Sequence, residues 1–216
     1  MRVLNRMPDT PEARSKGVAV TKYILDRWVA ADAFVAKVVG ELEADEEVKA
    51  LLEMSNINAV KRLGCNDHEM VHARIVTGTS MELLNLLLAR GVQPSSLAHG
   101  TSRSVDEVKL ILLLASYLHD IGNGVHREFH EAVGSVLAKE IVDRVLAKLT
   151  SLPLRQRVLI RQEIFSAIFS TAMNVRTLAE RRASSSWQMG WTCRRGGRVY
   201  RTSWGRWTCT RSPPST

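Results

Sequence analysis

The sequence predicts an all-α protein, a compact helical bundle over residues 1–176 followed by an irregular C-terminal tail over residues 177–216. Three observations lead to this class. Apolar residues recur every three or four positions, the segments they form are joined by short loops, and no segment of the bundle alternates as a strand would. With 216 residues, 45% of them hydrophobic and 24% charged, the chain is long enough for one domain with a sizeable core.

The first expected helical segment covers residues 18–53, as one long helix or a helix pair without Pro or Gly before Gly40. A turn-like cluster at 64–67 precedes a second helix over about 67–90, and residues 92–101 form a loop by composition. The apolar residues of the first segment that recur at helical spacing are Val18, Ile24, Leu25, Trp28, Val29, Phe34, Val38 and Leu42.

A buried helix is expected next, because Ser104 and Glu107 form a capping-box pattern directly before a long apolar run. This helix stops at the glycines of 122–124. Two further amphipathic helices are expected over about 129–149 and 153–172. Five or six helices joined by short loops indicate a bundle.

Composition excludes several classes of function. The N-terminus has no apolar signal region, and the longest apolar run, 110–115, is too short to span a bilayer, so we expect a cytoplasmic protein without a membrane partner. Cys65, Cys193 and Cys209 give neither an even disulfide set nor a zinc spacing. A framework of disulfides or thiol metal ligands is therefore not expected.

The net charge of +8 belongs to the tail. Residues 181–216 contain eight arginines and no acidic residue, which leaves 22 basic against 22 acidic residues in 1–180. A neutral body argues against a nucleic-acid partner for the bundle.

The candidate site centres on a His-Asp dipeptide at the end of the buried helix, where the chain turns at Gly122. A lone helical histidine is usually a surface or core residue, but clustering of histidines favours a metal site. Five of the six histidines fall into three short clusters, which are His68 with His72, His119 beside Asp120, and His126 with His130.

The order of these residues resembles the HD superfamily of metal-dependent phosphohydrolases. The matching strings are His72-Ala73-Arg74-Ile75-Val76, Leu118-His119-Asp120-Ile121-Gly122, and His130 at the start of the next helix. The resemblance covers about residues 55–176 and is nearest to small prokaryotic HD proteins of unassigned substrate. It implies an HD-type helical fold and an enzyme that cleaves a phosphomonoester or nucleotide with a metal-activated water.

The resemblance also implies a role for each histidine. His72, His119 and Asp120 would bind one metal ion, and His126 and His130 would serve a second ion or contact the phosphate. His119, Asp120 and His126 are then the expected catalytic residues. Imidazoles and a carboxylate suit a divalent Mn, Fe, Co, Ni or Zn ion, and Mg would need water ligands.

An anionic substrate also needs cationic contacts. Asp67 and His68 are expected to orient the metal ligands through hydrogen bonds, although Asp67 would serve equally well as a helix cap. The cationic side chains nearest to the ligands in the sequence, each of which is alternatively an ordinary solvated charge, are Arg127, Arg74, Lys61 and Arg62.

The chain departs from the family pattern after its last histidine, because the pattern ends with a further Asp ligand and no Asp follows Asp143 here. Translating Trp187 to Cys193 from one nucleotide earlier gives a string that resembles the family's Val-Ala-Asp-Gly-x-Asp-Met segment. Our hypothesis is a reading-frame slip around residues 172–180. The chain would then hold three of four ligands, which is expected to weaken metal binding and activity.

An alternative is a non-catalytic helical module that binds a nucleotide or nucleic acid, with structural histidines. A genuine tail, with four tryptophans among its arginines, would then form a nucleic-acid arm. A homo-oligomer is compatible with either interpretation.

Overall fold

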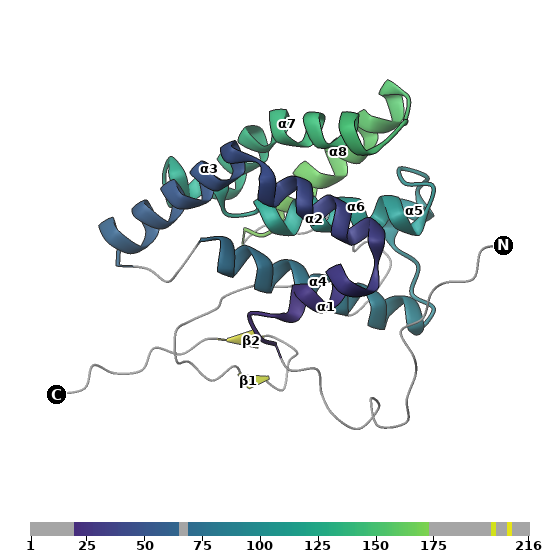
Figure 1. Cartoon of the computed structure of the whole chain (residues 1–216), viewed down its shortest axis with the longest axis horizontal. Coiled ribbons are helices and arrows are strands. Elements are labelled where there is room, and N and C mark those ends of the chain that lie inside the picture. Colours follow the sequence, from purple (N-terminus) through teal and green to yellow (C-terminus); the bar gives the residue numbers. More distant parts are fainter. Residues whose placement is uncertain (1–19, 65–68, 173–199, 202–206, 209–216) are drawn as a thin grey trace.

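The computed structural model describes residues 20–64, 69–172, 200–201 and 207–208, and it confirms the all-α class (Figure 1). Nearly all of the described chain is helical, and the helices pack into one bundle. The α-helices are α1 (Ile24–Ala31), α2 (Ala33–Ala44), α3 (Glu46–Asn56), α4 (Met70–Ala89), α5 (Ser95–Ala98), α6 (Val105–Leu118), α7 (His130–Leu149) and α8 (Leu154–Phe169), with a π-helix η2 (Ile57–Arg62) and a 3-10 helix η3 (Ile121–Gly124).

The first helical segment is divided more often than the sequence predicted. Residues 24–56 form three helices, because Asp32 and Asp45 adopt extended backbone and cap α2 and α3. The Asp32 carboxylate accepts hydrogen bonds from the backbone N–H groups of Phe34 and Val35 at 2.9 and 3.3 Å. Asp is a preferred N-cap because its oxygen satisfies N–H groups that lack a partner in the first turn. The expectation of one helix or a pair was therefore wrong.

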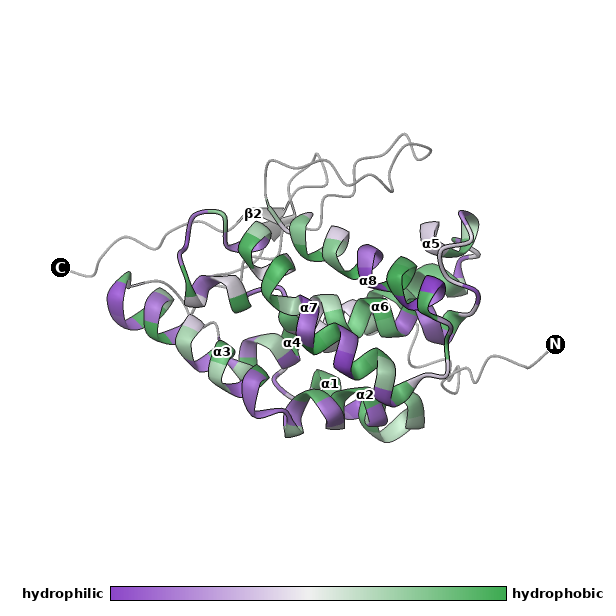
Figure 2. Ribbon diagram, turned by 90° about the horizontal axis from the view of Figure 1, so that it is seen from above, coloured by the Kyte–Doolittle hydropathy of each residue, from purple (hydrophilic) through white to green (hydrophobic). Residues whose placement is uncertain are grey.

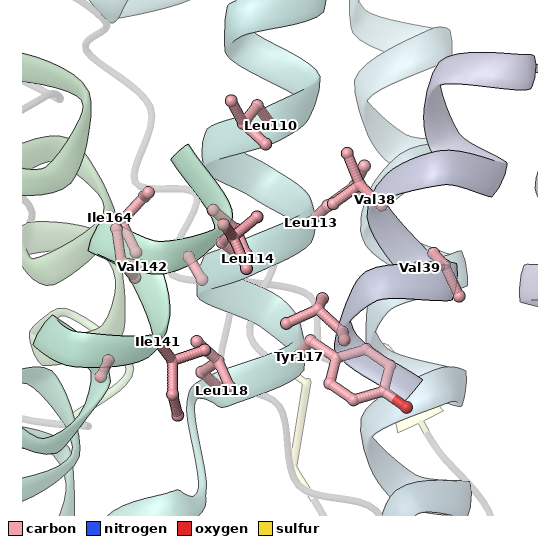
Figure 3. Close-up of a cluster of buried hydrophobic side chains, with 14 of the residues drawn as sticks. Val38, Val39, Leu110, Leu113, Leu114, Tyr117, Leu118, Ile141, Val142 and Ile164 are labelled. Carbon is pink, nitrogen blue, oxygen red and sulfur yellow. The ribbon is translucent and has the colours of Figure 1, made fainter. Parts of the chain in front are cut away.

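Helix α6 forms the centre of the core. It packs against α2 on one side and against α7 and α8 on the other (Figure 3), and Figure 2 colours it as mainly hydrophobic. Leu113, Leu114 and Tyr117 are fully buried. Burying each such side chain stabilises the fold by about 1.5–3 kcal/mol, so the position of the C-terminal end of α6 is strongly determined.

The predicted cap at the start of α6 is present, with the return bond of the capping box shifted by one residue to Arg103. The Ser104 hydroxyl accepts from the backbone N–H of Glu107 at 3.2 Å, and the Glu107 carboxylate accepts from the backbone N–H of Arg103 at 2.9 Å. The cap defines where α6 begins. At its C-terminal end the chain passes directly into His119, Asp120 and η3.

Helix α3 continues into the π-helix η2, and together they hold η3. The Ser55 hydroxyl donates to the backbone carbonyl of Ile121 at 3.1 Å. The Asn58 side-chain amide donates to the backbone carbonyls of Asn123 and Gly124 at 3.0 and 2.7 Å. These bonds fix the turn that follows the His-Asp dipeptide.

Two short strands lie in the tail, β1 (Tyr200–Arg201) and β2 (Trp207–Thr208), and they pair antiparallel. The predicted domain boundary between 176 and 177 and the proposed frame slip near 172–180 fall almost wholly outside the described residues. Among the helices that the structure describes, none has the length and apolar character required to cross a membrane.

Candidate metal centre

The three expected ligands of one metal converge at the C-terminal end of α6. His72 lies in the first turn of α4, His119 directly follows α6, and Asp120 leads into η3. All three are buried, with side chains at most 9% exposed. Within the described parts of the chain, this is the one group of three or more His, Cys, Asp or Glu side chains with ligand atoms within 4.8 Å of one another.

The Asp120 carboxylate faces both imidazoles with the same oxygen. Its Oδ2 lies 3.3 Å from Nε2 of His72 and 3.2 Å from Nε2 of His119. Two ligand atoms that bind one ion through bonds of about 2.1 Å lie about 3.0–3.4 Å apart, depending on the coordination angle. The separations therefore fit a shared divalent ion, and the donor set of two imidazoles and a carboxylate suits a transition metal.

The backbone selects the His119 tautomer that can bind a metal. Nδ1 of His119 lies 2.8 Å from the carbonyl oxygen of Ser116. Because a carbonyl oxygen only accepts, Nδ1 carries the proton and Nε2 keeps its lone pair for an ion. The bond also fixes the orientation of the ring.

Two opposing effects act on the pKa of His119. Burial lowers the pKa, whereas the negative charge and hydrogen bond of Asp120 raise it, and the net pKa lies above the ordinary value. The positive charge of Arg127 acts in the lowering direction. The Asp120 carboxylate thus favours a cation at Nε2 of His119, and a proton and a metal ion would compete for this position.

The structure brings His130 to the same carboxylate from the start of α7. Its Nε2 lies 3.5 Å from Oδ1 of Asp120, and its Nδ1 lies 2.8 Å from the carbonyl oxygen of Arg127.

His126 is placed differently. It is exposed, and its Nδ1 accepts a hydrogen bond from the backbone N–H of Glu128 at 3.1 Å. The metal and catalytic roles expected of His126 thus find no counterpart in the His72, His119 and Asp120 group and stay a prediction.

The four expected phosphate contacts occupy different places. Arg74 forms ion pairs with Glu43 and Asp26. Lys61 is exposed, and the Arg62 guanidinium donates to the Asn58 side-chain carbonyl at 2.7 Å.

Arg127 alone of these four contacts a histidine of the site within the described residues. Its Nη1 lies 3.5 Å from Nε2 of His130 and donates to the Asn123 side-chain carbonyl at 2.9 Å. Asp67 and His68, which were expected to orient the ligands, lie outside the described residues.

Two asparagines were missed by sequence reasoning. Asn123 is 1% exposed, and its side-chain amide donates to Oδ1 of Asp120 at 3.0 Å. The Asn58 side-chain amide donates to two backbone carbonyls of η3 and so holds this turn in place. One signal was present in the sequence, since each asparagine is followed four residues later by an arginine that hydrogen-bonds its side-chain carbonyl, Arg62 and Arg127 respectively.

Gly122 permits the approach of α7. A Cβ atom at this position would lie 1.9 Å from the backbone oxygen of His130 and 2.6 Å from the backbone nitrogen of Gly134. Only glycine fits between these backbone atoms, so the turn after the His-Asp dipeptide can touch the first turns of α7 and bring His130 to Asp120.

Fold and geometry together define the class of the molecule as an all-α protein with a buried His-His-Asp group that could hold a metal ion, compatible with an HD-like site. No family model matches the chain, and no solved structure matches it. The chain is similar to uncharacterized protein MJ1020 of Methanocaldococcus jannaschii, with 43% identity over 108 residues. The match covers 50% of this chain and 41% of the relative, so it spans about two fifths of that protein's length.

Proposed function

We propose that this chain is an HD-type metal-dependent phosphohydrolase that cleaves a phosphomonoester or nucleotide. One observation carries the proposal. Residues that lie 47 or more positions apart, His72 on α4 and the His119-Asp120 dipeptide after α6, bring two imidazole nitrogens within 3.2–3.3 Å of one buried carboxylate oxygen. The order and types of these residues resemble the superfamily's ligands, and the separations suit a shared ion.

Each residue has a role in this proposal. His72, His119 and Asp120 would hold a divalent ion, which when bound activates water and offsets negative charge on the phosphoryl oxygens. Arg127 would donate to those oxygens, because its guanidinium reaches the site beside His130. His130 faces the second oxygen of Asp120, where it would contact the phosphate or a second ion.

Metal analysis combined with a phosphatase screen tests the proposal. The full chain is purified, its metal content is measured, and hydrolysis of phosphomonoesters and nucleotides is assayed with Mn, Fe, Co, Ni, Zn and Mg. His72→Gln is expected to remove bound metal and activity together. His99→Gln is the matched control, because His99 is an exposed histidine at the end of α5. Its metal content and activity should equal those of the wild type.

The alternative makes a different prediction in the same experiment. A non-catalytic helical module would contain no transition metal, and adding Mn would leave its melting temperature unchanged, whereas a metal-binding protein is stabilised by the ion that it binds. Binding of single-stranded nucleic acid through the tail would then replace hydrolysis as the measurable property.

We further propose that the tail results from a reading-frame slip and that the restored frame supplies a fourth metal ligand. Resequencing the gene tests this directly, and an intact frame that encodes Trp187 and Trp191 would contradict it. If the slip is real, a frame-corrected chain should bind Mn at least about tenfold more tightly than the present one, because a ligand is regained.

A further inference from the structure

Asn123 forms hydrogen bonds in two directions from a fully buried position. Its Nδ2 donates to the side-chain Oδ1 of Asp120 and to the Asp120 backbone carbonyl, both at 3.0 Å. Its Oδ1 accepts from Nη1 of Arg127 at 2.9 Å. The orientation of the amide follows from these partners, since both Asp120 atoms accept and the guanidinium only donates.

The first consequence concerns the metal ligand. A carboxylate can rotate and exchange its two oxygens, but the Asn123 amide holds Oδ1 of Asp120 in place. Oδ2 is then the oxygen that faces His72 and His119. Asn123 thereby prepares Asp120 to bind an ion through one chosen oxygen.

The second consequence concerns Arg127, whose hydrogen-bond partners are an amide and an imidazole rather than carboxylates. Three other arginines of the described bundle pair with carboxylates, Arg74 with Glu43, Arg144 with Asp45 and Arg161 with Asp143. Among the described residues, no carboxylate lies within ion-pair distance of Arg127, which instead contacts the Asn123 amide and the His130 imidazole. A cation held in this way is suited to an anion.

We propose that Asn123 is a positioning residue that couples metal binding to phosphate binding. The Asn123 amide orients both the Asp120 oxygen that would bind the metal and the Arg127 guanidinium that would bind the anion. Binding of the metal therefore favours the orientation of Arg127 that binds the anion, and binding of the anion favours the orientation of Asp120 that binds the metal. Mn²⁺ and inorganic phosphate therefore bind cooperatively, and by linkage each tightens the other by the same factor. The anion part rests on the proposed function, whereas the orientation of Asp120 does not.

The experiment measures Mn²⁺ affinity of the full chain by electron paramagnetic resonance of free Mn²⁺, with and without saturating inorganic phosphate. For the wild type, phosphate should tighten Mn²⁺ binding at least about fivefold, the lower end of typical couplings. Asn123→Ala should weaken Mn²⁺ binding about tenfold, as loss of a hydrogen bond to a metal ligand does. In that variant, the coupling factor, which is the ratio of the Mn²⁺ affinities with and without phosphate, should fall close to one.

Asn58→Ala is the matched control for simple destabilisation. It also removes a buried amide that bonds η3, but it touches neither Asp120 nor Arg127 with its side chain. Its melting temperature should fall as much as that of Asn123→Ala, while its coupling factor stays that of the wild type. A purely structural role for Asn123 would give the two variants the same coupling factor and would overturn the proposal.

A second variant covers the case in which Asn123→Ala does not fold. Arg127 is partly exposed, so Arg127→Met should fold normally. It should lose the effect of phosphate on Mn²⁺ affinity, and an undiminished phosphate effect would overturn the proposal.

Failure of the coupling and failure of the proposed function give different results. Cooperative binding that depends on Asn123, in a protein that hydrolyses no phosphoester, would support the coupling and reject the hydrolase. Hydrolysis of a phosphoester, together with a coupling factor that Asn123→Ala leaves unchanged, would support the hydrolase and reject the coupling.

Discussion

The two sides of the candidate metal centre are built differently. On one side, His72, His119 and Asp120 are buried. The Ser116 carbonyl accepts a hydrogen bond from His119, and the Asn123 amide donates one to Asp120, so these two ligands are fixed in orientation. On the other, the segment between η3 and α7 is open to solvent, with Val125 60% and Phe129 75% exposed. Phe129 even adopts a left-handed backbone, with φ of 62°.

The difference separates two tasks. A buried group whose members are held by hydrogen bonds keeps its geometry without help from a ligand, as binding of a small ion requires. An exposed segment with a strained residue keeps its shape only because its neighbours impose it, and such residues concentrate at functional sites. We expect the buried side to determine metal affinity, and the exposed apolar residues of the other side, Val125 and Phe129, to tolerate substitution without loss of metal.

The largest effect should come from Gly122→Ala, because Gly122 lies where the turn after the His-Asp dipeptide contacts α7. The new methyl group would collide with the backbone of His130 and Gly134, and backbone atoms cannot move aside cheaply. We expect the free energy of unfolding, measured with urea, to fall by more than about 4 kcal/mol. Gly40→Ala is the control, because nothing lies within 4 Å of its added Cβ inside α2. It should stabilise the fold by about 0.5–1 kcal/mol.

Asp120→Asn tests the buried side alone. The amide keeps the shape of the side chain but removes the negative charge, so Mn²⁺ affinity measured by titration calorimetry should fall at least about 100-fold. The fold should persist. Asp106→Asn, at an exposed position in the first turn of α6, should leave Mn²⁺ affinity unchanged. An unaltered affinity in the Asp120 variant would place the metal elsewhere.

Phe129→Gly tests the open side alone, and here the expected sign is reversed. Glycine adopts a positive φ without strain, so the free energy of unfolding should rise by about 0.5–1 kcal/mol in thermal or urea unfolding. Mn²⁺ affinity should not change. Phe129→Ala removes the exposed ring but keeps the backbone strain, so it should bring no such gain. A loss of stability in the glycine variant would show that the ring supports the segment.

The last prediction concerns Asp32, which is remote from both sides. Burial raises the pKa of Asp32. Hydrogen bonds from Lys109 and from the N–H groups of Val35 and Phe34 lower it by a larger amount, so the net pKa lies below the ordinary value of 3.8. A carboxylate with a lowered pKa stabilises the fold above its unfolded pKa and loses this contribution as the pH falls through the folded pKa.

Asp32→Ala should therefore cost about 1 kcal/mol of unfolding free energy at pH 7, the usual value of an N-cap. The difference from the wild type should shrink as the pH falls below 3.8. A difference that does not vary with pH would contradict the charged cap. Metal affinity at neutral pH should be that of the wild type.

Sequence patterns predicted the features that depend on neighbours along the chain. The cap at Ser104, the buried helix behind it and the ligand pair at its end are all present. The breaks at Asp32 and Asp45 were missed because the apolar periodicity runs through both positions, and only the extended backbone there reveals the caps.

Features that depend on distant segments could not be predicted in the same way. Arg74 was expected at the phosphate, but its carboxylate partners, Glu43 and Asp26, lie 31 and 48 residues before it. Asn58 and Asn123 matter through bonds that only the folded chain forms, one of them across 65 residues. Residue types near a metal ligand therefore indicate which side chains are available, and the packing of helices decides which of them are used.

The π-helix η2 makes the site sensitive to chain length. A π-helix turn contains one residue more than an α-helix turn. A relative with one residue fewer in this segment would close it as an α-helix and rotate Asn58 by about 100° away from η3. The carbonyls of Asn123 and Gly124 would then lose their donor. A single deletion in an alignment across residues 57–62 would thus mark relatives that hold the turn after the His-Asp dipeptide in another way.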